Sequence, residues 1–155
     1  MRVVIIGGKG HVGTYLVPRL VEAGCTVINV SRGQNQPYQP HPAWQQVRQV
    51  TLDRSAAEAD GLFGERIAAL EADAVIDMVC FTLGSAKQLA ESLAGRVQHL
   101  LHCGTIWVHG HTVAAPTTEE QPRHPFGAYG EQKAAIEAYL LDQARRHGLP
   151  VTVLH

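Results

Sequence analysis

The sequence has few charged residues, few aromatic residues and no long hydrophobic run. Of its 155 residues, 17% are charged and 6% are aromatic, and the formal net charge is -1. No run of lysine and arginine exceeds two residues, so we expect neither a nucleic-acid partner nor a membrane surface. Only six residues precede the first glycine, too few for a signal peptide, which favours a cytoplasmic protein.

Cysteine is also scarce. The three cysteines, Cys25, Cys80 and Cys103, are odd in number and form no CxxC pair. This pattern favours reduced thiols over a disulfide framework. Each lies in or beside an apolar run, so we expect small buried side chains, with Cys80 and Cys103 as candidates for lining a site.

The nine histidines have no metal-site spacing around them. The densest group is His109 and His111 together with His102, and no cysteine or carboxylate stands beside it at a recognised metal spacing. We therefore expect no metal. The sequence also lacks a GxSxG segment, which argues against serine hydrolase chemistry.

Strand and helix patterns alternate strictly along the chain. Apolar strands are expected at 3–6, 27–30, 47–53, 74–81, 97–103 and from 151 onward. Helices are expected at 11–24, 55–71, 85–94 and about 127–146, with loops at 34–44 and 104–126. The helix at 55–71 is expected to be less regular because of Gly61 and Gly64. The pattern predicts an α/β fold with a doubly wound parallel sheet of about six strands, a three-layer α/β/α Rossmann domain covering 1–155.

A glycine-rich turn follows the first strand. Glycines at 7, 8, 10 and 13 satisfy two overlapping forms of the dinucleotide-binding spacing. A sharp turn, a close approach to a pyrophosphate and tight packing of helix on strand each exclude a Cβ. The helix N-terminus offers free N–H groups to the anion. The residues expected to contact a dinucleotide here are Gly7, Gly10, His11, Val12 and Gly13.

The end of the second strand bears on the choice of dinucleotide. NAD sites place a carboxylate there for the ribose hydroxyl, but this chain has Ser31 and Arg32 and no acid nearby. A guanidinium beside a small hydroxyl suits a 2′-phosphate, which favours NADP over NAD. The alternative is a solvated arginine in a loop.

Tyr129 and Lys133 are four residues apart in a predicted helix, so they lie on one face. A lysine near a tyrosine favours the phenolate and lowers the phenol pKa, as a general acid/base requires. A surface tyrosine and lysine on an amphipathic helix is the alternative, because the YxxxK pattern alone is short.

Taken together, GGxGxxG, an acid after the third strand, a threonine after the fifth and YxxxK occur in a fixed order. In this the sequence resembles the extended short-chain dehydrogenase/reductase family, which includes sugar-nucleotide epimerases and dehydratases. The resemblance covers essentially all 155 residues. It implies a C-terminal substrate-binding lobe after the sixth strand, so we expect this chain to be a truncated form that lacks the lobe.

The resemblance also implies roles for individual residues. Asp53 is expected to meet the adenine amino group. Met78, Val79 and Cys80 match the stretch along the ribose and nicotinamide, although family members carry smaller residues there. The segment 103–110 resembles Ser-Ser-x-x-Val-Tyr-Gly, which places Thr105 at the catalytic hydroxyl position.

The function implied is that of an NAD(P)-dependent epimerase, dehydratase or reductase. Thr105, Tyr129 and Lys133 would carry the catalysis, Lys133 would also hold the nicotinamide ribose, and the substrate would be a small carbonyl or alcohol compound such as a nucleotide sugar. The alternative is a dinucleotide-binding regulator or RNA-binding relative that has kept the fold. The family also implies a homodimer through the Tyr129 helix, whose compatible apolar positions are Ala134, Ala135, Ala138 and Leu141.

Overall fold

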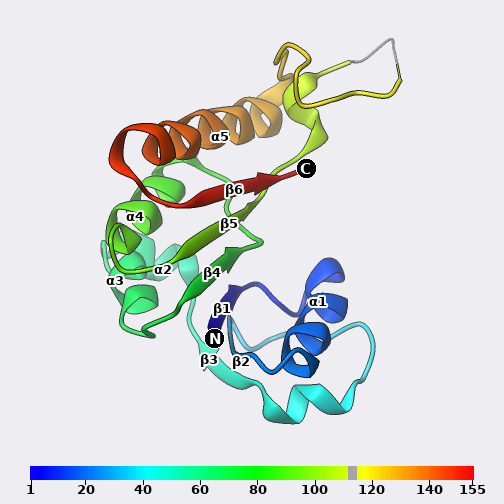
Figure 1. The fold of residues 1–155 in the computed structure, drawn as a ribbon, viewed down its shortest axis with the longest axis vertical. Helices are drawn as coiled ribbons and strands as arrows, with labels where there is room; N and C mark the ends of the chain where they lie inside the picture. Colours follow the sequence, from blue (N-terminus) through cyan, green and yellow to red (C-terminus); the bar gives the residue numbers. More distant parts are fainter. Residues whose placement is uncertain (112–114) are drawn as a thin grey trace.

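A six-stranded parallel sheet forms the centre of the molecule, in the order β3-β2-β1-β4-β5-β6 (Figure 1). The computed structural model describes residues 1–111 and 115–155. The strand order is that of two βαβ halves that meet between β1 and β4, the doubly wound arrangement predicted above. The strands are β1 (Arg2–Ile6), β2 (Thr26–Ser31), β3 (Arg48–Thr51), β4 (Ala74–Asp77), β5 (His99–Cys103) and β6 (Val151–Leu154).

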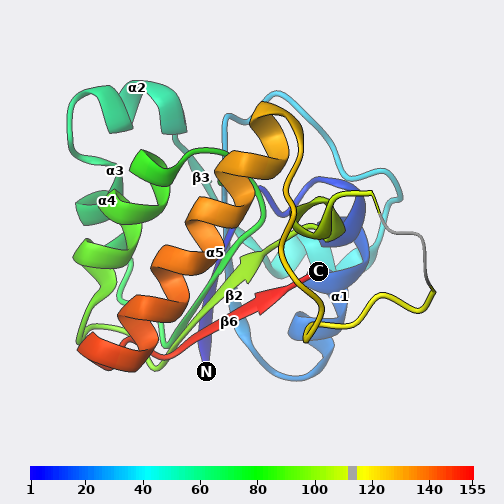
Figure 2. The ribbon, with the colours of Figure 1, turned by 90° about the horizontal axis from the view of Figure 1, so that it is seen from above.

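Helices cover both faces of this sheet (Figures 1 and 2). One face carries α2 (Arg54–Ala59), α3 (Phe63–Ala68), α4 (Leu83–Leu93) and α5 (Gly127–His147) over the larger hydrophobic core. The other carries α1 (His11–Glu22) and the 3-10 helix η1 (Pro42–Gln46) over a smaller core. Among the described residues, no helix is long and apolar enough to cross a membrane.

The single helix predicted at 55–71 is wrong, because the structure has two short helices there. Asp53 caps the first, α2, by accepting a hydrogen bond from the Ala56 N–H at 3.0 Å. The chain then turns at Gly61, which has a positive φ of 70°. In α3, a Cβ on Gly64 would overlap the Ser92 hydroxyl of α4, so this glycine allows the two helices to pack closely. Two glycines therefore divide the segment.

The fourth strand is shorter than predicted. It ends at Asp77 rather than at residue 81, because the Val79 N–H donates to the Asp77 carboxylate at 3.3 Å. In the described residues, the 3-10 helix η1 begins inside the first predicted loop and runs two residues past its end, and η2 (Ile106–His109) lies within the second. The part of the second loop at 112–114 lies outside the described residues.

On α5, the side chains that face the sheet are Ile136 and Leu140, both buried in the larger core. The four positions named for a dimer lie elsewhere on the helix. Ala138 is exposed, and the half-buried ones are Ala134, Ala135 and Leu141. Dimerisation through this helix stays a prediction.

Candidate functional site

The turn between β1 and α1 is held by close backbone packing. Gly7 has a φ of 85°, and its N–H donates to the Val30 carbonyl at 2.9 Å. A Cβ on Gly13 would overlap the backbone carbonyl of Gly8, so the helix can approach the turn only with glycine there. Gly10 precedes α1 without a side-chain cap, which leaves the first N–H groups of the helix available to an anion.

Asn29, which the sequence analysis missed, holds this turn through a side-chain hydrogen bond. Its side chain is fully buried in β2, and its Oδ1 accepts a hydrogen bond from the Gly8 N–H at 2.9 Å. Its amide nitrogen donates to Gln49 Oε1 of β3 at 2.8 Å. The amide thus connects the glycine turn to the strand at the sheet edge.

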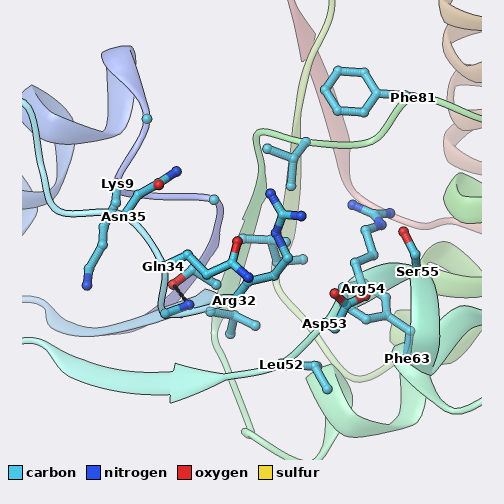
Figure 3. A pocket seen from close by; sticks show the side chains of 17 residues that line it. Lys9, Arg32, Gln34, Asn35, Leu52, Asp53, Arg54, Ser55, Phe63 and Phe81 are labelled. Atoms are coloured by element: carbon cyan, nitrogen blue, oxygen red, sulfur yellow. Dashed lines mark hydrogen bonds between the residues drawn. The ribbon is translucent and has the colours of Figure 1, made fainter.

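A cavity of about 390 Å³ opens above this turn, at the carboxyl ends of the strands (Figure 3). This is the edge at which doubly wound sheets bind their ligands, and the volume is within the usual range for a ligand pocket. Its lining comes from the ends of β1, β2 and β3, the glycine turn, the start of α2 and the segment after β4. Segments at the carboxyl ends of four of the six strands, β1 to β4, therefore contribute to a single hollow.

Basic and amide side chains gather on one side of the cavity, and a further basic residue, Arg54, lies on the Asp53 side (Figure 3). Lys9, Arg32, Gln34 and Asn35 lie together there, opposite the Asp53 side (Figure 3). Among the described residues that line the cavity, Asp53 carries the one carboxylate, and that group already caps α2. The cavity therefore suits an anionic ligand.

Six of the predicted cofactor contacts line this cavity: Gly7, Gly10, Ser31, Arg32, Asp53 and Val79. The other six are not among its lining residues. Gly13 packs under the turn, and the His11 ring lies against Tyr15 and Tyr38, with ring centroids 6.2 and 5.8 Å away. The positions outside the described lining are His11, Val12, Gly13, Met78, Cys80 and Lys133.

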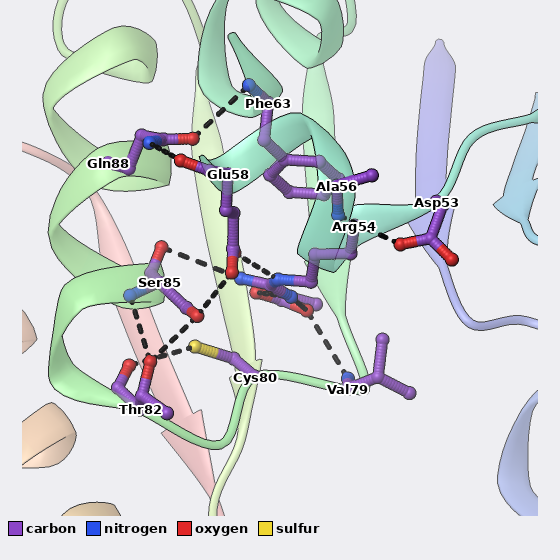
Figure 4. A network of polar contacts seen from close by, with 11 residues as sticks. Asp53, Arg54, Ala56, Glu58, Phe63, Val79, Cys80, Thr82, Ser85 and Gln88 are labelled. Carbon is purple, nitrogen blue, oxygen red and sulfur yellow. Dashed lines mark hydrogen bonds and ion pairs between the residues drawn. The ribbon is translucent and has the colours of Figure 1, made fainter. Parts of the chain in front are cut away.

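A buried ion-pair network lies behind the cavity (Figure 4). Arg54 at the start of α2 donates from Nη1 to both oxygens of Asp77, at 2.8 and 3.0 Å, and from Nε to Glu58 at 2.5 Å. Glu58 also accepts from the Ser85 hydroxyl at 2.7 Å, which ties α2 to α4. The adjacent carboxylates raise the pKa of Arg54 against the effect of burial, so the guanidinium stays charged.

Lys133 lies inside the protein rather than beside solvent. Its side chain is 3% exposed, and its Nζ contacts His102 Nε2 at 2.9 Å and donates to the carbonyls of Cys80 and Cys103 at 3.1 and 2.6 Å. Burial lowers the pKa of Lys133 from its ordinary value. The contacts of the ammonium are thus made with the ends of β4 and β5.

Tyr129, one turn earlier on α5, is 44% exposed and lies among aromatic rings. Its ring centroid is 6.5 Å from that of Phe81 and 6.2 Å from that of Trp107, and Trp107 stacks on Phe126 at 5.1 Å. Thr105 caps η2 by accepting from the Trp107 N–H at 3.4 Å, which leaves its own hydroxyl proton available to another acceptor. Since η2 packs against α5, the threonine and the tyrosine are carried by adjoining elements.

The structure also groups three side chains of metal-ligand type: Asp77, Cys80 and His102, whose ligand atoms lie within 4.8 Å of one another. All three are buried. However, Arg54 already binds the Asp77 carboxylate, and the Lys133 ammonium already contacts His102. Burial raises the pKa of the Cys80 thiol to about 12. A metal ion would have to displace two cations and deprotonate that thiol.

Sequence reasoning missed Arg54 and Asp77, and it considered His102 only as a metal ligand. Asp77 ends the apolar strand β4 (AVID), and His102 lies within the mostly apolar strand β5 (HLLHC). A polar residue in a strand buried on both faces requires a partner, so each was a usable signal. Their partners come from α2 and α5, which no local pattern identifies.

Comparison with known proteins agrees with this geometry. Residues 3–155 match the model of the NAD dependent epimerase/dehydratase family. A 2'-dehydrokanamycin reductase from Streptomyces kanamyceticus is 32% identical over 137 residues, covering 88% of this chain and 37% of that protein. A UDP-glucose 4-epimerase from Streptomyces lividans is 24% identical over 94% of this chain and 48% of that protein.

The fold likewise matches solved structures. The crystal structure of UDP-glucose 4-epimerase with UDP-glucose from Thermotoga maritima has a TM-score of 0.82 and 24% identity, over 100% of this chain and 55% of that one. The UDP-glucose 4-epimerase from Brucella ovis in complex with NAD has a TM-score of 0.78 and 19% identity, over 98% and 50%. The chain thus spans about half the length of the proteins whose fold it shares.

Proposed function

Because the chain belongs to the NAD dependent epimerase/dehydratase family, we propose that it forms the nucleotide-binding part of an NAD(P)-dependent epimerase, dehydratase or reductase. The substrate would be a small molecule with a carbonyl or secondary alcohol, such as a nucleotide sugar. The observation that carries the proposal is the cavity over the glycine turn, at the carboxyl edge of the sheet and lined with basic and amide groups.

The residues of this cavity fit a dinucleotide. Gly7 and Gly10 let the backbone approach a pyrophosphate, and the uncapped start of α1 offers it N–H donors. Asp53 stands at the far side, where an adenine amino group would meet its free carboxylate oxygen. When bound, a nicotinamide cofactor supplies the hydride chemistry.

Three side chains of this chain would manage the proton. Tyr129 is exposed to a substrate and would donate or accept the proton at the reacting oxygen. The Thr105 hydroxyl would hydrogen-bond to the same oxygen and fix its position. Lys133, one helical turn from Tyr129, would supply a positive charge near the reacting groups.

The cofactor would be NADP rather than NAD. Lys9 and Arg32 flank the cavity, and among the described residues neither makes an ion pair with an acid. A 2′-phosphate at the end of β2 would meet the Arg32 guanidinium, with Ser31 beside it.

Calorimetric titration tests this preference. Arg32→Ser should weaken NADP binding by about tenfold to a hundredfold, the worth of a charge-assisted hydrogen bond, and leave NAD binding unchanged. Arg48→Ser is the matched control. Arg48 is an exposed arginine at the start of β3, at the end of the strand away from the cavity, and it does not line the cavity. A wild-type preference for NAD would remove the role given to Arg32.

A variant of Tyr129 separates an enzyme from a protein that binds a dinucleotide for regulation or RNA binding. Tyr129→Phe keeps the ring and its aromatic contacts but removes the acidic proton. In a form of the protein that carries the substrate-binding lobe, hydride transfer should fall by about 10² to 10⁴ while cofactor affinity stays the same. Equal rates in wild type and variant would favour the binding protein.

A further inference from the structure

All three hydrogens of the Lys133 ammonium are directed at acceptors within the protein. An ammonium has three donors, and the structure gives Nζ three partners, at 3.1 Å on Cys80 O, 2.9 Å on His102 Nε2 and 2.6 Å on Cys103 O. Two of them are backbone carbonyls, which no substitution of a side chain alters. His102 is the one acceptor of the three that a side chain provides, so it is the one that a substitution can remove.

The contact determines which form His102 takes. The ammonium has no lone pair, so His102 Nε2 must accept, and the ring proton must then reside on Nδ1. Burial, and secondly the charge of Lys133, lower the pKa of His102 to about 4. The ring is therefore neutral at pH 7 and remains an acceptor.

We propose that His102 is a positioning residue, whose neutral ring holds the Lys133 ammonium in place and in its charged form between the ends of β4 and β5. The inference rests on the proposed function, in which that charge lies near the reacting groups. Burial lowers the pKa of Lys133, and loss of one of its three acceptors would lower it further. His102 supplies the third acceptor and so favours the charged form.

Other charged and titratable groups face this pair from the neighbouring elements. They are Asp77 at the end of β4, Arg54 on α2, Glu137 on α5, Cys80 after β4 and Cys103 on β5. The charges of Asp77 and Glu137 favour a protonated His102, whereas that of Arg54 opposes it. Each test variant therefore leaves all five groups in place.

The first experiment reads the ring directly and needs neither cofactor nor turnover. A long-range proton–nitrogen NMR spectrum of the wild-type chain at pH 7 should show His102 neutral, with the proton on Nδ1. Lys133→Met should then raise the pKa of His102, because a nearby positive charge is removed. A proton on Nε2, a charged ring at pH 7 or an unchanged pKa in the variant would each overturn the proposal, whatever the protein's activity.

The second experiment separates positioning from mere packing. His102→Gln places an amide oxygen near the position of Nε2, whereas His102→Leu fills the space without an acceptor. The pKa of Lys133, followed by NMR of its side chain, should fall by about one unit in the leucine variant and stay near the wild-type value in the glutamine variant. Equal pKa values in the two variants would refute the role.

His99→Gln is the matched control. His99 lies on the same strand, but its ring pairs with the Thr152 hydroxyl at 2.9 Å and does not contact Lys133. This variant should leave the pKa of Lys133 unchanged, and a shift as large as that of His102→Leu would show a general effect of altering β5. If the wild-type chain does not bind cofactor, the proposed function fails, while the NMR results still decide the role of His102.

Discussion

Removing the Asp77 carboxylate tests whether the buried ion pair with Arg54 holds the two halves of the fold together. Both side chains are largely inaccessible, with 2% of Asp77 and 13% of Arg54 exposed. Asp77→Ala would leave a buried guanidinium with one remaining carboxylate, Glu58. Breaking a buried pair on one side costs about 3 to 5 kcal/mol, and because Glu58 stays bound we expect the lower end, about 3 kcal/mol.

Urea denaturation followed by circular dichroism measures this loss. Thermal unfolding offers a second measurement: in a chain of this size, a loss of about 3 kcal/mol lowers Tm by about 6 to 12 °C. Glu65→Ala is the control, because its pair with Arg96 has the same chemistry but side chains that are 58% and 55% exposed. That surface pair should contribute less than about 1 kcal/mol.

Two results would refute this reasoning. One is a loss in Asp77→Ala no larger than that in Glu65→Ala, which would mean that burial does not strengthen the pair. The other concerns the triple variant Arg54→Met, Glu58→Gln and Asp77→Ala. It removes all three charges of the network, so it should be more stable than Asp77→Ala alone. If it is less stable, the cost arises from lost packing on the Phe63 ring, which lies 4.7 Å from the guanidinium carbon.

Two further predictions concern the glycine turn and the buried histidine. Gly13→Ala should weaken NADP binding by about tenfold or more in calorimetry, because its methyl group overlaps the Gly8 carbonyl and overpacking costs about 1 to 3 kcal/mol. Gly84→Ala, with nothing within 4 Å of the added methyl, should bind normally, and equal losses in both variants would contradict this. The folded pKa of His102 lies below its ordinary value of 6.5, at about 4, so the unfolded state binds more protons between these pH values. The free energy of unfolding, measured by urea denaturation at each pH, should therefore fall by about 3 kcal/mol as the pH falls from 6.5 to 4. His102→Leu should remove that dependence, and an unchanged slope would assign it to other groups.

The sequence was sufficient for the parts of this molecule in which neighbours in the chain decide the structure. The β-branched run ending at Ile6 predicted a strand buried on both faces, and the spacing through Gly13 predicted a tight turn into a helix. The alternation of strands and helices was enough to predict a parallel, doubly wound sheet, since parallel strands need crossover helices between them.

What the sequence could not provide depends on residues far apart in the chain. The division of the predicted helix at 55–71 follows from packing of α3 on α4 through Gly64. The buried setting of Lys133 depends on His102, 31 residues away, and that of Asp77 on Arg54, 23 residues away. Periodicity reports which face of an element is apolar, but it does not report which polar side chains from different elements meet beneath it.

The amide of Asn29 has a consequence for how the turn responds to motion elsewhere. It receives the Gly8 N–H on one side and reaches Gln49 on the other, and β3 has a neighbour on one side only. Edge strands open more readily than central ones. Opening of β3 would remove Gln49, the partner of the buried Asn29 amide nitrogen, and leave that donor unsatisfied. Hydrogen exchange at Gly8 should accordingly quicken whenever β3 frays, so that the glycine turn and the outermost strand loosen as one unit.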